Sequence, residues 1–239
     1  MLVAVVTAYY KETTEVLRRC YDSVKAQTHP NVVHIMVSDG VPNPEVDNWD
    51  VVHAKLPPSG DCGDTPRAVG GLIASNLGAD ALCMLDADNY YDPDHIETLL
   101  DLQKQSGAHV VTATRMLIRM DGTTLGVCKE SDGNHFNDTN CYLLTKPAFG
   151  CMASWGFKDK RESLTGDRIF WATIKRSGAV LAHSVKPTIN YVTSFAYHYQ
   201  VNGEKPPEGA KVIVKFAGEQ FSKVIPFEEY ERLTQQQPK

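Results

Sequence analysis

The chain has 239 residues, of which 42% are hydrophobic and 22% are charged, and its formal net charge is −5. This length is enough to bury a core and suits one α/β domain with a small extension. The negative charge argues against general nucleic-acid binding, which requires a basic face.

Strand and helix patterns alternate through the first half of the chain. Short continuous apolar runs predict strands that are buried on both faces, and amphipathic stretches between them predict helices. In chain order, we predict strands at 2–6, 32–37, 51–54, 81–85 and 109–114, and helices at 12–27, 65–77 and 92–107.

The second half of the chain is less regular. Loop-forming and polar residues dominate 115–166, interrupted by a short apolar stretch at 142–144. Beyond them we expect a helix at 165–177, a strand at 179–183 and a charged helix-like stretch at 227–233. We predict three parts, at 1–115, 116–203 and 204–239, and the last is a C-terminal extension.

The cysteines and the chain start favour a cytoplasmic protein. Six cysteines are present without a CxxC pair, so a zinc site is not expected, and Cys20 and Cys83 lie in apolar patterns typical of buried thiols. The first residues lack a basic segment and predict a strand rather than a signal peptide. No apolar run approaches the roughly 20 residues of a membrane-spanning helix.

The alternation of strand and helix predicts the fold class and the place of the site. It favours an α/β fold with a mostly parallel, Rossmann-like sheet and helices on both faces, followed by an irregular segment. In open sheets of this kind, ligands bind at the carboxyl ends of the strands.

Acidic residues follow the fourth predicted strand directly, as Asp86-Ala87-Asp88. Carboxylate oxygens are hard ligands that suit Mg²⁺ or Mn²⁺. A divalent cation that bridges a diphosphate offsets its charge and makes it a better leaving group. We therefore predict a metal site at Asp86 and Asp88, although a solvated turn explains the same residues.

Two other strand ends and one helix complete the predicted pocket. Thr7, Ala8 and Tyr9 follow the first strand and Asp39 ends the second, so they are expected at the same sheet edge. Arg67 lies in the first turn of a helix, where a cation opposes the helix dipole and is not placed for helix stability. It is a candidate ligand of a base or a diphosphate, and a plain surface arginine is the competing interpretation.

Several segments together resemble family-2 glycosyltransferases, over residues 1 to about 185. They are V-A-V-V-T-A-Y-Y at 3–10, C-Y-D-S-V-K-A-Q-T-H-P at 20–30, H-I-M-V-S-D-G at 34–40, P-R-A-V-G-G at 66–71, M-L-D-A-D-N at 84–89 and G-D-R-I-F at 166–170. The resemblance implies the GT-A fold and the transfer of a sugar from a nucleotide-diphosphate sugar, with UDP as the favoured nucleotide. The Q-x-x-R-W motif of processive synthases is missing, which favours the transfer of one sugar.

The resemblance implies that 1–115 is the nucleotide-sugar-binding half and that 116–203 is the acceptor-binding and catalytic half. It also implies roles for individual positions. Positions that hold the base and ribose match Thr7, Ala8, Tyr9 and Asp39. Arg67 matches a position near the base or diphosphate. Asp86 and Ala87 match donor-binding positions, and Asp88 matches the metal ligand. Asp167 matches the general base of inverting members and lies at a predicted helix start, where the dipole favours its charged form. Glu162 is the nearest alternative carboxylate on the N-terminal side.

The remaining site predictions concern the acceptor and a third metal ligand. Polar side chains before the 142–144 stretch, together with a tryptophan, suit a sugar or another hydroxyl acceptor, and a capped turn explains them equally well. They are Asn137, Asp138, Asn140 and Trp155. His198, with His183 as the alternative, is the candidate third ligand of a Mn²⁺ or Mg²⁺ cofactor, and a core or surface histidine explains either residue.

Two other functions remain open at the level of sequence. A sugar nucleotidylyltransferase needs a glycine-rich loop after the first strand to bind a triphosphate, and residues 7–11 contain no glycine. A non-catalytic nucleotide-sugar-binding protein has no need of Asp86, Asp88 and Asp167 together. The acceptor, the donor sugar and a homo-oligomeric state stay undetermined from the sequence.

Overall fold

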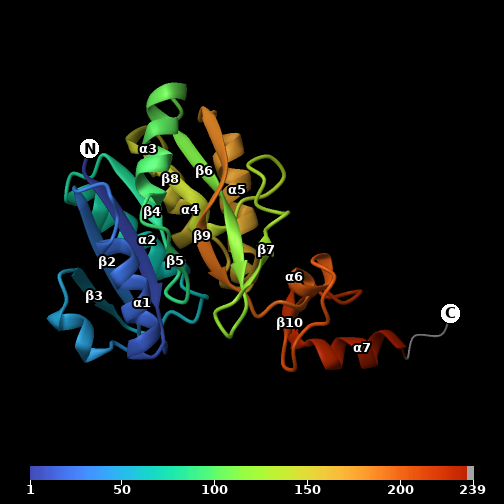
Figure 1. The fold of residues 1–239 in the computed structure, drawn as a ribbon. Coiled ribbons are helices and arrows are strands. Elements are labelled where there is room, and N and C mark those ends of the chain that lie inside the picture. The colour runs from blue at the N-terminus through green and yellow to red at the C-terminus, as the bar shows by residue number, and fades with distance from the viewer. Residues whose placement is uncertain (236–239) are drawn as a thin grey trace.

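A computed structural model describes residues 1–235, and its main feature is a nine-stranded sheet. The strand order is β3-β2-β1-β4-β8-β6-β9-β5, and β7 pairs with β6 (Figure 1). The strands are β1 (Val3–Tyr9), β2 (Val32–Asp39), β3 (Val52–Leu56), β4 (Ala81–Met84), β5 (Tyr90–Tyr91), β6 (Val110–Ile118), β7 (Thr124–Val127), β8 (Tyr142–Thr145) and β9 (Leu181–Val192). The helices are α1 (Thr14–Lys25), α2 (Asp64–Asn76), α3 (His95–Ser106), α4 (Ala153–Gly156), α5 (Gly166–Arg176), α6 (Ala196–Val201) and α7 (Phe227–Gln235).

Strand direction places the predicted ligand residues at one edge. β1 is parallel to β2 and β4, and β2 is parallel to β3, so their carboxyl ends point the same way. β8 lies antiparallel between β4 and β6, and β6 runs parallel to β9. The predicted α/β fold with a Rossmann-like sheet is confirmed, and the N-terminal strands follow the predicted order.

Helices cover both faces of the sheet because successive strand residues point to opposite sides. Val3 and Val5 of β1 belong to one core, with residues of α1 and α3 such as Cys20. Ala4 and Val6 belong to the other core, with residues of α2, α4 and α5 such as Phe170. The predicted burial of Cys20 is confirmed, since its side chain is fully buried.

Gly70 allows α2 to approach β1 closely, and its replacement is expected to destabilise the fold. A Cβ atom at Gly70 would overlap Cγ1 of Val6, a β-branched side chain with little rotamer freedom. We expect Gly70→Ala to lower the free energy of unfolding by about 1–3 kcal/mol. Urea denaturation measures this change. Gly150→Ala is the control, because the added Cβ has no neighbour within 4 Å there, and an equal effect of both variants would contradict the packing argument.

The second half holds more strand than the sequence pattern indicates. β6 and β9 are longer than predicted and run side by side from Val110/Leu181 to Ile118/Val192. A small hairpin of β10 (Lys211–Val214) and β11 (Lys223–Pro226) precedes α7. Figure 1 shows α6, β10 and α7 together beyond the end of the large sheet. Within residues 1–235, no helix is long and apolar enough to cross a membrane.

Candidate active site

A cavity of about 540 Å³ opens at the carboxyl ends of β1, β2 and β4, and we call it the strand-end cavity. The predicted residues Ala8, Tyr9, Asp39, Arg67, Asp86, Ala87 and Asp88 all line it. Tyr10, Glu12 and Cys62 also line it and were not predicted. Thr7 is different, because its buried hydroxyl pairs with Nε2 of His34 at 2.9 Å inside the core.

Two of the lining residues are already held by protein contacts. The Tyr9 hydroxyl lies 2.6 Å from Nε2 of His53 and accepts a hydrogen bond from the amide of Asn43. The carboxylate of Asp39 accepts hydrogen bonds from the amide and the hydroxyl of Ser59, at 2.6 and 2.9 Å. Both side chains are therefore fixed before any ligand binds.

Asp86 stands at the centre of a polar network. Its Oδ1 pairs with Nη2 of Arg67 at 2.6 Å. Its Oδ2 accepts a hydrogen bond from the side chain of Asn140, and its amide donates to Oδ1 of Asn140 at 2.6 Å. Burial disfavours the charge on Arg67, but the carboxylates of Asp86, Asp64 and Asp138 together outweigh this and raise the pKa of Arg67. The network fixes the direction of both charged groups.

A second cavity, of about 680 Å³, lies at the N-terminus of α5, and we call it the α5 cavity. It shares Cys62, Arg67 and Asp86 with the strand-end cavity, so the two spaces meet at the Arg67–Asp86 ion pair. Asp167 of α5 and Arg115 of β6 line its wall. A ligand that extends past the ion pair would therefore reach Asp167.

Asp167 has the chemistry of a proton acceptor near neutral pH. Burial, together with the nearby carboxylate of Asp138, raises the pKa of Asp167 from its ordinary 3.8 to about 6. The amide of Arg168 donates a hydrogen bond to Oδ1 at 2.7 Å. A carboxylate whose pKa lies near the working pH is suited to general-base catalysis.

The four predicted acceptor residues divide into two pairs. Asp138 and Trp155 line the α5 cavity, where Asp138 pairs with Arg115 and the ring of Trp155 lies below the guanidinium of Arg67. Asn137 and Asn140 are fully buried and are not among the residues that line this cavity. Asn140 uses its amide on Asp86 and Asp138.

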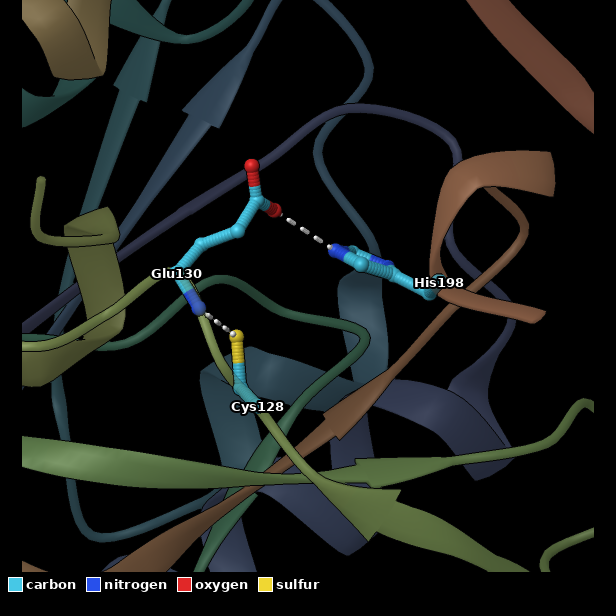
Figure 2. Close-up of side chains that lie close together, drawn as sticks. All are labelled: Cys128, Glu130 and His198. Carbon is cyan, nitrogen blue, oxygen red and sulfur yellow. Dashed lines mark hydrogen bonds and ion pairs between the residues drawn. The ribbon is translucent and has the colours of Figure 1, made fainter. Parts of the chain in front are cut away.

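His198 lies beside Glu130 and Cys128, as Figure 2 shows. Its Nε2 is 3.3 Å from Oε2 of Glu130, and this contact lowers the pKa of Glu130. The three ligand atoms lie within 4.8 Å of one another. However, the guanidinium of Arg115 contacts the same group, with Nε donating to Cys128 at 3.2 Å and Nη2 3.3 Å from His198. A cation of the chain itself therefore occupies this cluster.

The predicted metal ligands are not all together. Among residues 1–235, the ligand atoms of Asp86, Asp88 and His198 do not form a group within 4.8 Å. His198 and Asp86 line the α5 cavity, whereas Asp88 and Asp86 line the strand-end cavity. Asp86 thus lines both cavities, and a ligand near the Arg67–Asp86 pair would lie between Asp88 and His198.

Asp88 has the properties expected of a cation ligand. The guanidinium of Arg19 donates to its backbone oxygen at 2.6 Å, but within residues 1–235 no other residue bonds its carboxylate. Desolvation by the surrounding protein and the carboxylates of Asp86 and Glu12 raise the pKa of Asp88 to about 7. Because Asp88 keeps contact with solvent, screening weakens this effect. A group of nearby carboxylates in which Asp88 bonds no other described residue fits Mg²⁺ or Mn²⁺.

Comparisons with known proteins give a family match over part of the chain and a similar fold. The family model described as Glycosyl transferase family 2 matches residues 72–164. The crystal structure of S. aureus TarS is similar, with a TM-score of 0.62 and 13% identity, over 84% of this chain and 38% of TarS. TarS 1–349 in complex with UDP gives a TM-score of 0.61 at 13% identity, over 84% of this chain and 63% of that one.

A third structure, TarS 1–349 in complex with UDP-GlcNAc, gives a TM-score of 0.61 at 12% identity, over 84% of this chain and 64% of that one. The chain spans less than two thirds of the length of these structures. No curated protein sequence matches the chain. The predicted GT-A fold and the predicted resemblance to family-2 glycosyltransferases are confirmed.

Proposed function

We propose that this chain, part of which matches glycosyltransferase family 2, transfers one sugar from a nucleotide-diphosphate sugar to an acceptor hydroxyl with inversion. The observation that carries the proposal is the meeting of two cavities at Arg67 and Asp86. The strand-end cavity suits the nucleoside, and the α5 cavity holds the carboxylate of Asp167. The donor sugar would lie at the junction between the strand-end cavity and the α5 cavity.

Charge and strand geometry support this site for the donor. Ala8, Tyr9 and Asp39 surround the space where the base and ribose are expected, and Arg67 offers a cation beside it. We take UDP as the nucleotide, because the similar TarS structures contain UDP and UDP-GlcNAc. A guanidinium next to a diphosphate makes charge-assisted hydrogen bonds and stabilises the leaving group.

A divalent cation is the proposed cofactor, with Asp88, Asp86 and His198 as its ligands. His198 would have to give up its contacts with Arg115 and Glu130 to bind it. When bound, Mn²⁺ or Mg²⁺ offsets the charge of the leaving diphosphate. The carboxylate of Asp88 fits this role, because Asp88 lines the strand-end cavity and its carboxylate bonds no other residue within 1–235. Asp86 would have to share its oxygens with Arg67 and Asn140, which already bond them.

Asp167 is the proposed general base of a single displacement. Its carboxylate takes the proton of the acceptor hydroxyl while the acceptor oxygen bonds to the anomeric carbon. The bond from that carbon to the diphosphate oxygen breaks, and the diphosphate leaves with the electron pair. One displacement inverts the anomeric configuration.

The alternatives are separated by a thermal-shift screen of UDP-, GDP- and TDP-sugars with Mn²⁺. A ligand that binds only the folded state raises the melting temperature. Stabilisation by UDP-sugars together with release of UDP supports transfer. Stabilisation without turnover points to a binding protein, and nucleotide triphosphate consumption points to a nucleotidylyltransferase.

Asp39→Ala tests the nucleoside pocket. We expect it to weaken UDP binding by about 1–3 kcal/mol, the cost of an unpaired polar group in the site. Isothermal titration calorimetry measures the change. Because Asp39 also holds the amide and hydroxyl of Ser59, Ser59→Ala is the control for a loosened loop. An affinity equal to that of wild type would place Asp39 in an ordinary turn.

The pH dependence tests the base directly. Asp167 acts only when deprotonated, and its pKa is about 6, so kcat/KM should rise with pH through this value. Because the pKa of the proposed metal ligand Asp88 is raised to about 7, the rise should continue to about pH 7 before it levels off. The measurement is a pH profile of sugar transfer with donor and Mn²⁺ held constant. If kcat/KM does not change between pH 5 and 7, roughly one unit to either side of the pKa of Asp167, Asp167 is not the general base.

A further inference from the structure

The C-terminal part of the chain forms one wall of the α5 cavity, and we call it the C-terminal wall. Its residues are Tyr197, Lys211, Ile213, Val224, Phe227 and Tyr230, which all line this cavity. The hairpin and α7 that carry most of them lie beyond the end of the large sheet (Figure 1). The wall therefore lines the same space as Asp167.

The wall is attached firmly to the part of the chain that carries His198. Lys211 donates its amide to the carbonyl of Ser194 at 2.7 Å, and Phe227 donates its amide to Ala210 at 2.7 Å. Buried Phe227 packs with Ala196 and Ala210. These contacts hold the hairpin against the start of α6, so the wall keeps its position relative to the cavity.

The wall presents apolar side chains that are not covered by the protein. Ile213 and Val224 are 43% and 39% exposed, and they are direct partners across the hairpin, so they project to the same side. Tyr197 and Tyr230 are 50% and 36% exposed and line the same cavity. Apolar groups gathered in one cavity mark a binding site for an apolar group.

Other residues that line the cavity are charged. Arg115 and Asp138 form a buried ion pair, and Asp167, Glu130 and Arg168 line the same cavity. The hairpin contributes the charged Lys211 as well as the apolar Ile213 and Val224. A carbohydrate hydroxyl finds no hydrogen-bond partner in the side chains of Ile213 and Val224, so these two residues favour a ligand with an apolar group.

We propose that the acceptor is amphipathic, with its reacting hydroxyl at Asp167 and an aliphatic or aromatic group against Ile213, Val224 and Tyr230. This inference rests on the proposed function, because Asp167 defines the reacting end. Removing the apolar group from water supplies binding energy that a free sugar lacks. The wall therefore selects acceptors by their apolar part.

The test compares three ligands that share one sugar and differ in the group attached to it. Methyl, phenyl and octyl β-D-glucoside are titrated into ¹⁵N-labelled protein, with octyl glucoside below its micelle concentration. Each buried methylene is worth roughly fourfold in affinity. We expect phenyl or octyl glucoside to bind at least about tenfold more tightly than methyl glucoside, with the preferred ligand identifying an aromatic or an aliphatic group. Equal dissociation constants for all three would overturn the inference.

Variants distinguish binding at the C-terminal wall from non-specific binding of the apolar glucosides elsewhere on the protein. Ile213→Asp and Val224→Ser should reduce the preference for the apolar glucosides, since a polar group on the wall disfavours burial. Val185→Asp is the control, because Val185 is 82% exposed and does not line the cavity. A preference that survives both wall variants would contradict the assignment, as would one that Val185→Asp also removes. The amide spectrum of each variant verifies its fold.

A UDP titration of the same samples distinguishes this inference from the proposed function. If UDP binds and the three glucosides bind equally, only the acceptor inference is wrong. If UDP does not bind, the proposed function and the acceptor role of the cavity are both wrong, even if the apolar glucosides bind more tightly.

Discussion

Asp167→Asn should lower kcat for sugar transfer by about 10²–10⁴-fold, the usual contribution of a positioned general base. Asparagine keeps the size and most of the hydrogen bonding of aspartate but cannot take a proton. Asp167 lies across the Arg67–Asp86 junction from the strand-end cavity. UDP binding should therefore be nearly unchanged. Steady-state kinetics together with calorimetry separate the two effects.

Glu162→Gln is the matched control for Asp167→Asn. Glu162 is exposed in the 3₁₀ turn before α5 and does not line the α5 cavity. Its replacement should leave kcat unchanged. If Asp167→Asn keeps the wild-type kcat while Glu162→Gln loses it, the proton goes to Glu162. Retention of the anomeric configuration in the product, measured by NMR, would also exclude the single displacement.

Asp88→Ala should abolish transfer and greatly weaken the binding of UDP in the presence of Mn²⁺. The loss is expected because the carboxylate of Asp88, which lines the strand-end cavity, is the proposed ligand of the metal. The fold should survive, since this exposed side chain makes no bond to another residue in the part of the chain that the structure describes. Kinetics, calorimetry and thermal melting together measure these three effects.

Asp101→Ala is the control for the removal of a carboxylate, because Asp101 is exposed on α3 and lines neither cavity. It should change neither activity nor UDP affinity. Full activity of the wild-type enzyme in excess EDTA would contradict the metal-dependent mechanism. Activity that Mn²⁺ or Mg²⁺ restores after EDTA treatment is the expected result.

The first half of the fold could be predicted from sequence because its signals are local. The apolar runs of β1, β2 and β4 and the amphipathic faces of α1 and α3 each lie within one short segment. Parallel order then places Tyr9, Asp39 and Asp86 at one edge without further information. This rule alone predicted most of the strand-end cavity.

The second half could not be predicted in the same way, because its signals depend on distant partners. β6 contains the charged Arg115, which is buried only because Asp138 pairs with it. β9 contains Pro187, which lies at an irregularity in the register with β6, and proline interrupts a strand pattern. The hairpin of β10 and β11 has an eight-residue connection, at 215–222, which is too long for a short-turn signal.

The same reason limits the prediction of the site. Asn140 lies 54 residues from Asp86 in sequence, and only the fold shows that its amide orients this carboxylate. The polar residues before β8 therefore suggested acceptor contacts, whereas Asn137 and Asn140 are buried. Glu130 and the C-terminal wall carry no motif, so the cavity that they line became visible only in three dimensions.

Release of UDP from UDP-GlcNAc in the presence of Mn²⁺ tests the central claim most directly. The donor is the one bound in a similar TarS structure. We predict that the wild-type protein releases UDP above the rate without enzyme, that EDTA stops the release, and that Asp88→Ala abolishes it. If none of the UDP-, GDP- and TDP-sugars raises the melting temperature or yields free nucleoside diphosphate, with or without Mn²⁺, the account is contradicted.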